Sequence, residues 1–182
     1  MIFDEKAVRL KDGREAVFRS PSEDDAAQML EFIAKASGET DFLMKFPEEY
    51  DSFTLEQERE FINSAADSPD SMMIACFIDG IFAGNCRIDF MSGKRVCHRA
   101  SCGIAIIREF WGLGIGTHMF EEMFDAAAER GIRQIELDYI EGNSRARALY
   151  EKMGFRIIGA KPDAIRMRDG TFVNEYMMIK ML

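Results

Sequence analysis

The sequence is poor in the residues that hold metals, disulfides and nucleic acids. Its 4 cysteines include no C-x-x-C pair and it has only 2 histidines, so a zinc site or a disulfide framework fits badly. We therefore expect no metal, and small buried thiols at Cys76, Cys86, Cys97 and Cys102. The 23 Lys and Arg against 32 Asp and Glu leave a net charge of -9, which argues against a nucleic-acid partner. The same charge suits a cationic substrate, or simply keeps the protein soluble.

Long apolar runs and linkers are also missing. The longest apolar run, residues 72–78, is far too short to cross a membrane, and residues 1–18 contain no apolar stretch of signal-peptide length. With 4 prolines and no Gly/Ser-rich tract, the 182 residues predict one domain, 1–182. We expect a cytoplasmic protein with no membrane partner.

The periodicity of what is present predicts an α/β fold. Ser20 and Glu23 form an expected capping box at the start of a first helix, and Thr54 with Gln57 forms one for a second. Asp79 and Gly80 form the turn of an expected hairpin. The other expected elements are strands at 15–20, 98–107, 133–140, 155–167 and 171–182 and helices at 117–130 and 144–153. Their order predicts a mixed sheet, mostly antiparallel at first, with helices crossing between later strands.

Three glycines on alternate positions precede one of these helices, in REFWGLGIGTHMF, residues 108–120. Without side chains, Gly112, Gly114 and Gly116 would let backbone N–H groups converge on a pyrophosphate at the helix N-terminus. No lysine follows Gly116, which excludes an ATP-binding P-loop, and Thr117 stands where the dinucleotide fingerprint needs a glycine. A plain turn between strand and helix explains the loop alone equally well.

The loop and the later segment IELDYIEGNSRARALYEKMGF, residues 135–155, together resemble the GNAT superfamily of acetyl-CoA-dependent N-acetyltransferases, over residues 102–158. The sequence is similar to ribosomal-protein alanine and small-amine acetyltransferases. The resemblance implies a mostly antiparallel twisted sheet with one splayed pair of parallel strands, flanked by helices. It also implies acetyl transfer to a primary amine of a small molecule or a protein N-terminus. Trp111 stands where the family usually has Gln or Arg, which leaves the backbone donors intact.

The resemblance further implies where acetyl-CoA is held. Strand residues would offer backbone groups to the pantetheine arm, and an N–H near Ile106 would polarise the thioester carbonyl. Asn143 would contact the pantetheine, besides acting as a helix N-cap. The implied cofactor-binding residues are Ile104, Ala105, Ile106, Gly112, Leu113, Gly114, Ile115, Gly116, Thr117, Asn143 and Tyr150.

Two side chains are the expected catalytic groups. Tyr150 falls two helical turns after Asn143, on the same face. The resemblance implies that its phenol, which holds its proton at neutral pH, protonates the departing thiolate. A core aromatic is the alternative. Asp138 lies five residues before Asn143, where similar enzymes carry a glutamate base; Glu141 or a water chain are alternatives, and a solvent-facing strand would also place a carboxylate at Asp138.

The acceptor is the least defined part. The acidic and aromatic segment 38–60 is expected to line its cleft, although a solvated loop has the same composition. Strand 171–182 could pair with a second copy to form a homodimer, or complete the sheet within one chain. An acyl-CoA-binding sensor without turnover is the main alternative function, and a dinucleotide-dependent oxidoreductase is a weaker one.

Overall fold

The computed structural model describes residues 1–182, which form two compact units. Unit 1 comprises residues 1–89 and 103–119, and unit 2 comprises residues 90–102 and 120–182. The chain passes between the units three times, at the end of β4 (Ile81–Phe90), within β5 (Arg99–Ile106) and within α3 (Ile115–Glu129). The elements that begin in unit 1 are β1 (Lys6–Arg9), β2 (Glu15–Arg19), η1 (Glu23–Asp25), α1 (Ala26–Glu39), η2 (Pro47–Tyr50), α2 (Leu55–Asp67), β3 (Ser71–Ile78), β4 (Ile81–Phe90), η3 (Arg108–Phe110) and α3 (Ile115–Glu129).

The strands follow the order β1-β2-β3-β4-β5-β6-β8-β7 in a sheet of 8 strands. The remaining elements are β5 (Arg99–Ile106), β6 (Gln134–Ile140), α4 (Ser144–Lys152), β7 (Arg156–Arg166) and β8 (Phe172–Met181). Strands β5 and β6 pair in parallel, from Arg99 opposite Gln134 to Ser101 opposite Glu136. The pairs β1–β2, β2–β3, β3–β4, β6–β8 and β7–β8 are antiparallel. The expected mixed, mostly antiparallel sheet with one parallel pair is confirmed.

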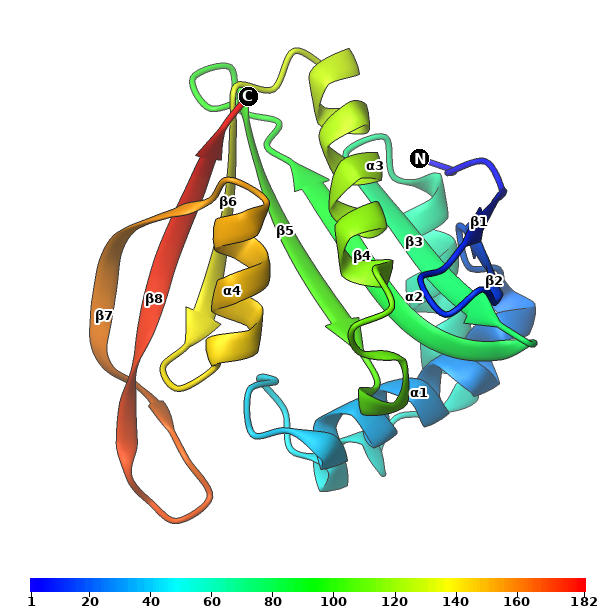
Figure 1. Ribbon diagram of the computed structural model, residues 1–182, viewed down its shortest axis with the longest axis horizontal. Helices are drawn as coiled ribbons and strands as arrows, with labels where there is room; N and C mark the ends of the chain where they lie inside the picture. The colour runs from blue at the N-terminus through cyan, green and yellow to red at the C-terminus, as the bar shows by residue number, and fades with distance from the viewer. The chain divides into compact units, whose positions relative to one another are not determined.

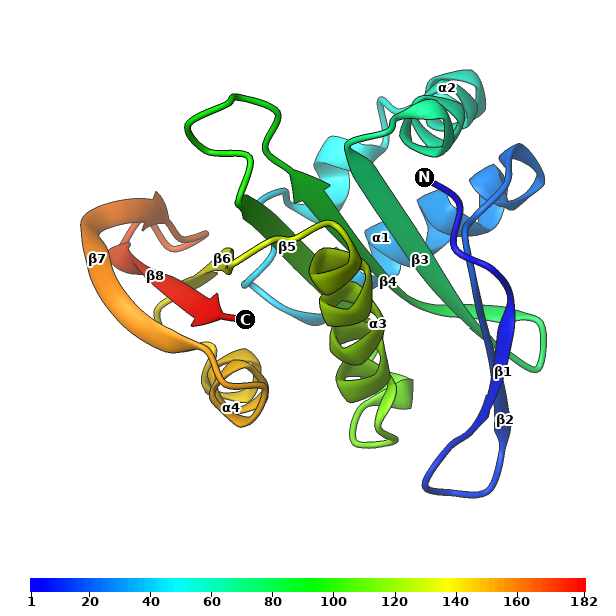
Figure 2. The ribbon, with the colours of Figure 1, turned by 90° about the horizontal axis from the view of Figure 1, so that it is seen from above.

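Unit 1 is built around β3, whose 8 residues are all buried. Helices α1 and α2 pack on each other and lie on the same side of β3 (Figure 2). The expected capping box of α2 is confirmed, because the Gln57 N–H donates to Thr54 Oγ1 at 3.2 Å and the Thr54 N–H donates to Gln57 Oε1 at 2.9 Å. The hairpin turn is also confirmed, with φ of 50° at Asp79 and 79° at Gly80.

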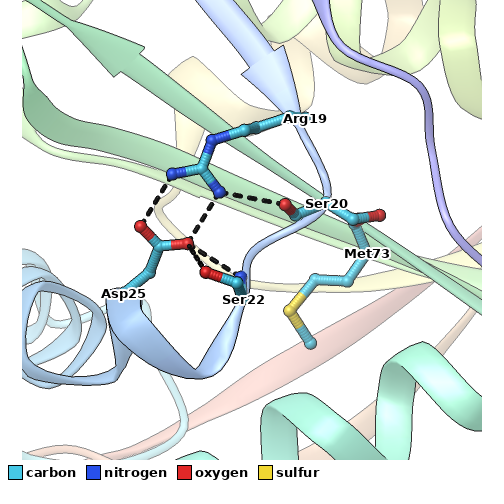
Figure 3. Close-up of polar contacts among 5 residues, drawn as sticks. All are labelled: Arg19, Ser20, Ser22, Asp25 and Met73. Atoms are coloured by element: carbon cyan, nitrogen blue, oxygen red, sulfur yellow. Dashed lines mark hydrogen bonds and ion pairs between the residues drawn. The ribbon is translucent and has the colours of Figure 1, made fainter.

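The first helix begins differently from the expectation, through a partly buried ion pair (Figure 3). Asp25, not Glu23, accepts from the Ser22 N–H at 2.7 Å, and Ser20 Oγ instead donates to the Met73 carbonyl at 3.0 Å. Burial favours the neutral form of Asp25, but hydrogen bonds from Arg19 and Ser22 outweigh it and lower the Asp25 pKa. The Arg19 guanidinium lies 2.6 and 2.7 Å from the two Asp25 oxygens, so this pair ties the end of β2 to the start of α1.

In unit 2, α4 lies against β6, and β7 and β8 form a long curved hairpin (Figure 1). Its core is aromatic. The Tyr150 ring lies 5.7 Å from the Phe120 ring, 6.2 Å from Phe155 and 6.4 Å from Tyr139. The face of β6 that carries Tyr139 therefore packs on α4.

Two features depart from the expectations. Strand β1 was not predicted, because its four residues are mostly exposed at the end of the strand order and show no usable hydrophobic pattern. Cys97 is exposed in the turn between β4 and β5, so the expected burial is wrong there, whereas Cys76 and Cys86 are buried. None of the helices is long and apolar enough to span a bilayer.

Candidate active site

The glycine loop turns the chain into α3 by positive backbone angles. Gly112 has φ of 82° and Gly114 has φ of 100°, a region that L side chains rarely adopt. The Gly114 carbonyl accepts from the Thr117 N–H at 3.0 Å and from the His118 N–H at 3.2 Å. The first N–H groups of a helix have no partner within it, so those preceding Thr117 remain the donors that the loop can present. The N–H of Thr117 itself is engaged inside the first turn.

The contacts at the end of β5 show which of its backbone groups face β4 and which face away from it. The Ile107 N–H donates to Ala83 of β4 at 3.1 Å, and the Ala105 oxygen lies 3.1 Å from where a Cβ would stand on Gly84. Because backbone groups alternate sides along a strand, those of Ile104 and Ile106 point away from β4. This orientation is the one that the expected pantetheine contact requires.

Trp111 ties the loop to β5. Its indole Nε1–H donates to the Ile106 carbonyl at 2.6 Å, and the Arg108 guanidinium lies 5.5 Å from the Trp111 ring. Trp111, at the position usually held by Gln or Arg, is thus hydrogen-bonded to the Ile106 carbonyl and leaves the Ile106 N–H without a bond to it. The sequence alone did not predict this contact.

A second contact that the sequence did not predict comes from the turn between β1 and β2. The Lys11 N–H donates to the Leu113 carbonyl at 3.3 Å. The Lys11 side chain lies across Gly114, with Cε 3.7 Å from the place of an added Cβ there. A lysine from the start of the chain therefore reaches the glycine loop.

In unit 2, Asn143 and Tyr150 lie on α4. The Asn143 Oδ1 accepts from the Ala146 N–H at 3.1 Å, which confirms the expected N-cap. Tyr150 is 8% exposed, and its hydroxyl has no hydrogen-bond partner in the structure. Burial, with a smaller contribution from Cys102 on β5, raises the Tyr150 pKa well above its ordinary value. The phenol therefore stays protonated at any physiological pH.

Asp138 does not stand alone on β6. Lys161 of β7 places its Nζ 2.8 Å from Asp138 Oδ2 and 2.8 Å from Glu175 Oε2 of β8. The hydrogen bonds that Lys161 donates to Asp138 and Glu175 raise the Lys161 pKa, so this ammonium is held firmly in its charged form. Asp138 and Lys161 are exposed and Glu175 is half-buried, and in this cluster one cation lies between two carboxylates.

The alternative base, Glu141, is engaged elsewhere. Its carboxylate accepts from the Asn174 N–H at 3.0 Å and from the Tyr176 hydroxyl at 3.2 Å. Tyr176 in turn stacks on Tyr139 at 5.2 Å. Glu141 therefore joins the start of α4 to β8.

The segment between α1 and α2 belongs to unit 1 and exposes apolar side chains. Met44 is 74% exposed, and the Lys45 ammonium lies 4.1 Å from the centre of the Phe53 ring. Its assignment to the acceptor cleft stays a prediction.

The structure thus gathers the predicted residues in two groups. The glycine loop and residues 104–106 lie in unit 1, and Asp138, Asn143 and Tyr150 lie in unit 2. A mixed sheet with a single parallel pair is not the doubly wound parallel sheet of a dinucleotide-dependent oxidoreductase. A strand, a glycine loop and a helix, followed by a capped helix with a buried tyrosine, are the arrangement that the resemblance to an acyltransferase implied.

Comparison with known proteins gives the family. Residues 39–155 match the acetyltransferase (GNAT) family, and the chain belongs to it. The acetyltransferase of GNAT family from Streptococcus pneumoniae is 30% identical, with a TM-score of 0.84 over 92% of this chain and 99% of that one. The protein is an N-acetyltransferase, as the resemblance implied.

Two more distant structures share the fold. Ribosomal-protein-alanine N-acetyltransferase from Brucella melitensis is 20% identical, with a TM-score of 0.77 over 91% of this chain and 99% of that one. RimJ from Mycobacterium smegmatis, solved in complex with CoA-disulfide, is 16% identical, with a TM-score of 0.75 over 97% and 86%.

Proposed function

We propose that residues 1–182 act as one catalytic domain that transfers an acetyl group from acetyl-CoA to a primary amine. The core of the cofactor site is residues 102–158. The observation that carries the proposal is Tyr150. Its phenol is buried on the helix that Asn143 caps, and its hydroxyl makes no hydrogen bond within the protein. The RimJ structure holds a coenzyme A derivative, which supports the same cofactor here.

The cofactor would be held mainly by backbone groups. The N–H groups from Gly112 to Gly116 suit a pyrophosphate, because they lie at the positive end of the α3 dipole. The outward-facing N–H and carbonyl of Ile104 suit the amides of the pantetheine arm, and the Ile106 N–H, whose own carbonyl accepts from Trp111, suits the thioester oxygen.

The reaction needs two proton transfers. The amine nitrogen attacks the thioester carbon, the carbon–sulfur bond breaks, and the thiolate takes the Tyr150 proton. The nitrogen loses a proton to Asp138, directly or through a water molecule. Lys161, with its Nζ 2.8 Å from Asp138 Oδ2, would hold that carboxylate in position.

The acceptor is proposed as a small amine or a protein N-terminus. The Brucella melitensis relative is named for a ribosomal protein alanine, which supports testing peptides as well as small amines. Strand β8 pairs with β6 on one side and β7 on the other, so residues 171–182 complete the sheet within one chain and leave no edge there for a second copy. A homodimer formed in another way and a cytoplasmic location stay predictions.

Calorimetric titration with acetyl-CoA, run beside NAD(P), tests the cofactor, and thiol release across a panel of amines and peptides tests turnover. We expect binding of acetyl-CoA alone, and thiol release with at least one acceptor. Binding of acetyl-CoA without turnover on any acceptor would favour the acyl-CoA sensor. If acetyl-CoA does not bind, the proposed function is wrong.

A further inference from the structure

The Lys11 ammonium stands in an electrostatic setting that lacks a counter-charge. The side chain runs over Gly114, where its Cγ and Cε lie 3.9 and 3.7 Å from the place of an added Cβ. Gly114 immediately precedes α3, so the ammonium is brought to the positive end of that helix dipole. A cation at a helix N-terminus is repelled by the dipole, and such a position favours an anion.

The available carboxylates do not relieve this repulsion. The next residue, Asp12, forms its ion pair with Arg14, at 2.8 Å between Oδ2 and Nε. Lys11 makes no ion pair or side-chain hydrogen bond in the structure. Lys11 is an exposed residue, so its ammonium is free to meet an anion at the loop.

The backbone holds Lys11 at the loop independently of its charge. The Lys11 N–H donates to the Leu113 carbonyl, and the turn is closed by the Leu10 N–H on the Arg14 carbonyl at 2.8 Å. The Arg14 guanidinium lies 5.3 Å from the Phe110 ring of η3, so the turn packs against the segment leading into the glycine loop. The hydrogen bond to Leu113 and the packing of Arg14 on Phe110 therefore hold Lys11 beside the loop.

We propose that Lys11 binds the pyrophosphate of coenzyme A together with the backbone N–H groups of the glycine loop. This inference rests on the proposed function, because that function supplies the anion. The ammonium adds a mobile point charge to donors that are otherwise backbone dipoles, and the bound anion removes the repulsion between Lys11 and the helix. Because Gly114 has no side chain, the aliphatic part of the Lys11 side chain can lie across it.

The test compares Lys11→Met with Lys6→Met, which removes the same charge from β1 of the same hairpin. Calorimetry at low salt should show CoA affinity reduced about fivefold to tenfold in Lys11→Met and within about twofold in Lys6→Met. The loss should shrink as salt is raised, and it should be equal with dephospho-CoA, which keeps the pyrophosphate. A loss that disappears with dephospho-CoA would overturn the assignment to the pyrophosphate, and equal affinities for the two variants would overturn the role of Lys11.

Inorganic pyrophosphate separates this inference from the proposed function. It should raise the unfolding temperature of the wild type and of Lys6→Met more than that of Lys11→Met. If the wild type binds no CoA but shows this difference, the proposed cofactor is wrong and the anion site stands. If CoA binds but Lys11→Met responds to both ligands as the wild type does, the anion role of Lys11 is wrong and the cofactor stands. Unfolding of the ligand-free variants checks the fold, since Lys11→Met removes a repulsion and should not be less stable.

Discussion

The glycine loop and the β6–α4 region present their chemistry in different ways. The loop offers backbone N–H groups whose direction depends on positive φ at Gly112 and Gly114, and only Lys11 adds a side chain. The β6–α4 region offers side chains, and each one is already shaped by its neighbours: Tyr150 by burial and Asp138 by Lys161. Substitutions that keep the backbone conformation should leave binding at the glycine loop unchanged. In the β6–α4 region, removal of a single side-chain atom should change activity.

The largest effect should come from removing one oxygen in the side-chain region. In Tyr150→Phe the ring contacts with Phe120 and Tyr139 can persist, but the thiolate loses its proton donor. We expect kcat to fall about 100-fold or more, with CoA affinity within about twofold. Steady-state kinetics with calorimetry measure both, and Tyr176→Phe is the matched control because its hydroxyl bonds Glu141. Equal losses in the two variants would assign the effect to packing.

The backbone region should respond to strain. In Gly112→Ala the added Cβ meets no atom within 4 Å, so the cost is the positive φ alone. Because the unliganded loop can relax away from that angle, binding must restore it, and CoA affinity should fall about tenfold while kcat at saturation is kept.

Gly170→Ala is the control for strain, with φ of 85° and an equally open position in the turn between β7 and β8. It should lower the unfolding temperature without changing CoA affinity. An affinity loss in both variants would mean that Gly112 acts through general stability.

The ion pair of Asp138 gives a smaller effect. In Lys161→Met the Asp138 carboxylate loses the ammonium that lies 2.8 Å from it, so its side chain is held less firmly in place. We expect kcat/KM to fall about twofold to threefold, with CoA affinity within about twofold. Lys94→Met, in the exposed turn before β5, is the control for net charge. Equal kcat/KM values in the two variants would show that Lys161 does not position Asp138 for proton transfer.

The smallest expected effect is on the stability of the fold and comes from Glu58. Glu58 of α2 is 7% exposed, and burial raises its pKa, whereas Asp138 of β6 is exposed. A raised folded-state pKa favours the protonated form, so stability falls as pH rises from the ordinary value of 4.5 to the folded-state pKa, and stays lower above it.

Glu58→Gln removes that loss. Its unfolding temperature should exceed that of the wild type by roughly 2–4 °C at pH 8 and match it near pH 4. The control Glu56→Gln, on an exposed position of the same helix, should show no such difference. A Glu58→Gln variant no more stable at pH 8 would show that Glu58 is solvated in the folded state.

Local signals predicted most of the fold. The α2 capping box, the Asp79–Gly80 turn and the Asn143 cap each depend on residues within a few positions of one another, and the structure has all three. The start of α1 was predicted at the wrong residues because Ser20 and Ser22 are equally good local caps. The Arg19–Asp25 ion pair and the Ser20 bond to Met73 decide between them, and the second of these depends on packing between distant segments.

The sequence by itself determined the class of protein, the glycine loop and the tyrosine on a capped helix, because spacing and backbone freedom are properties of short segments. Tertiary structure alone decided that Lys11 reaches Gly114, that Trp111 takes the Ile106 carbonyl and that Lys161 faces Asp138. Lys161 meets Asp138 across β8, where Glu175 pairs with Lys161 on one side and with Ile140 on the other. The charge at each part of the site is set by strand order and register, which no local pattern encodes.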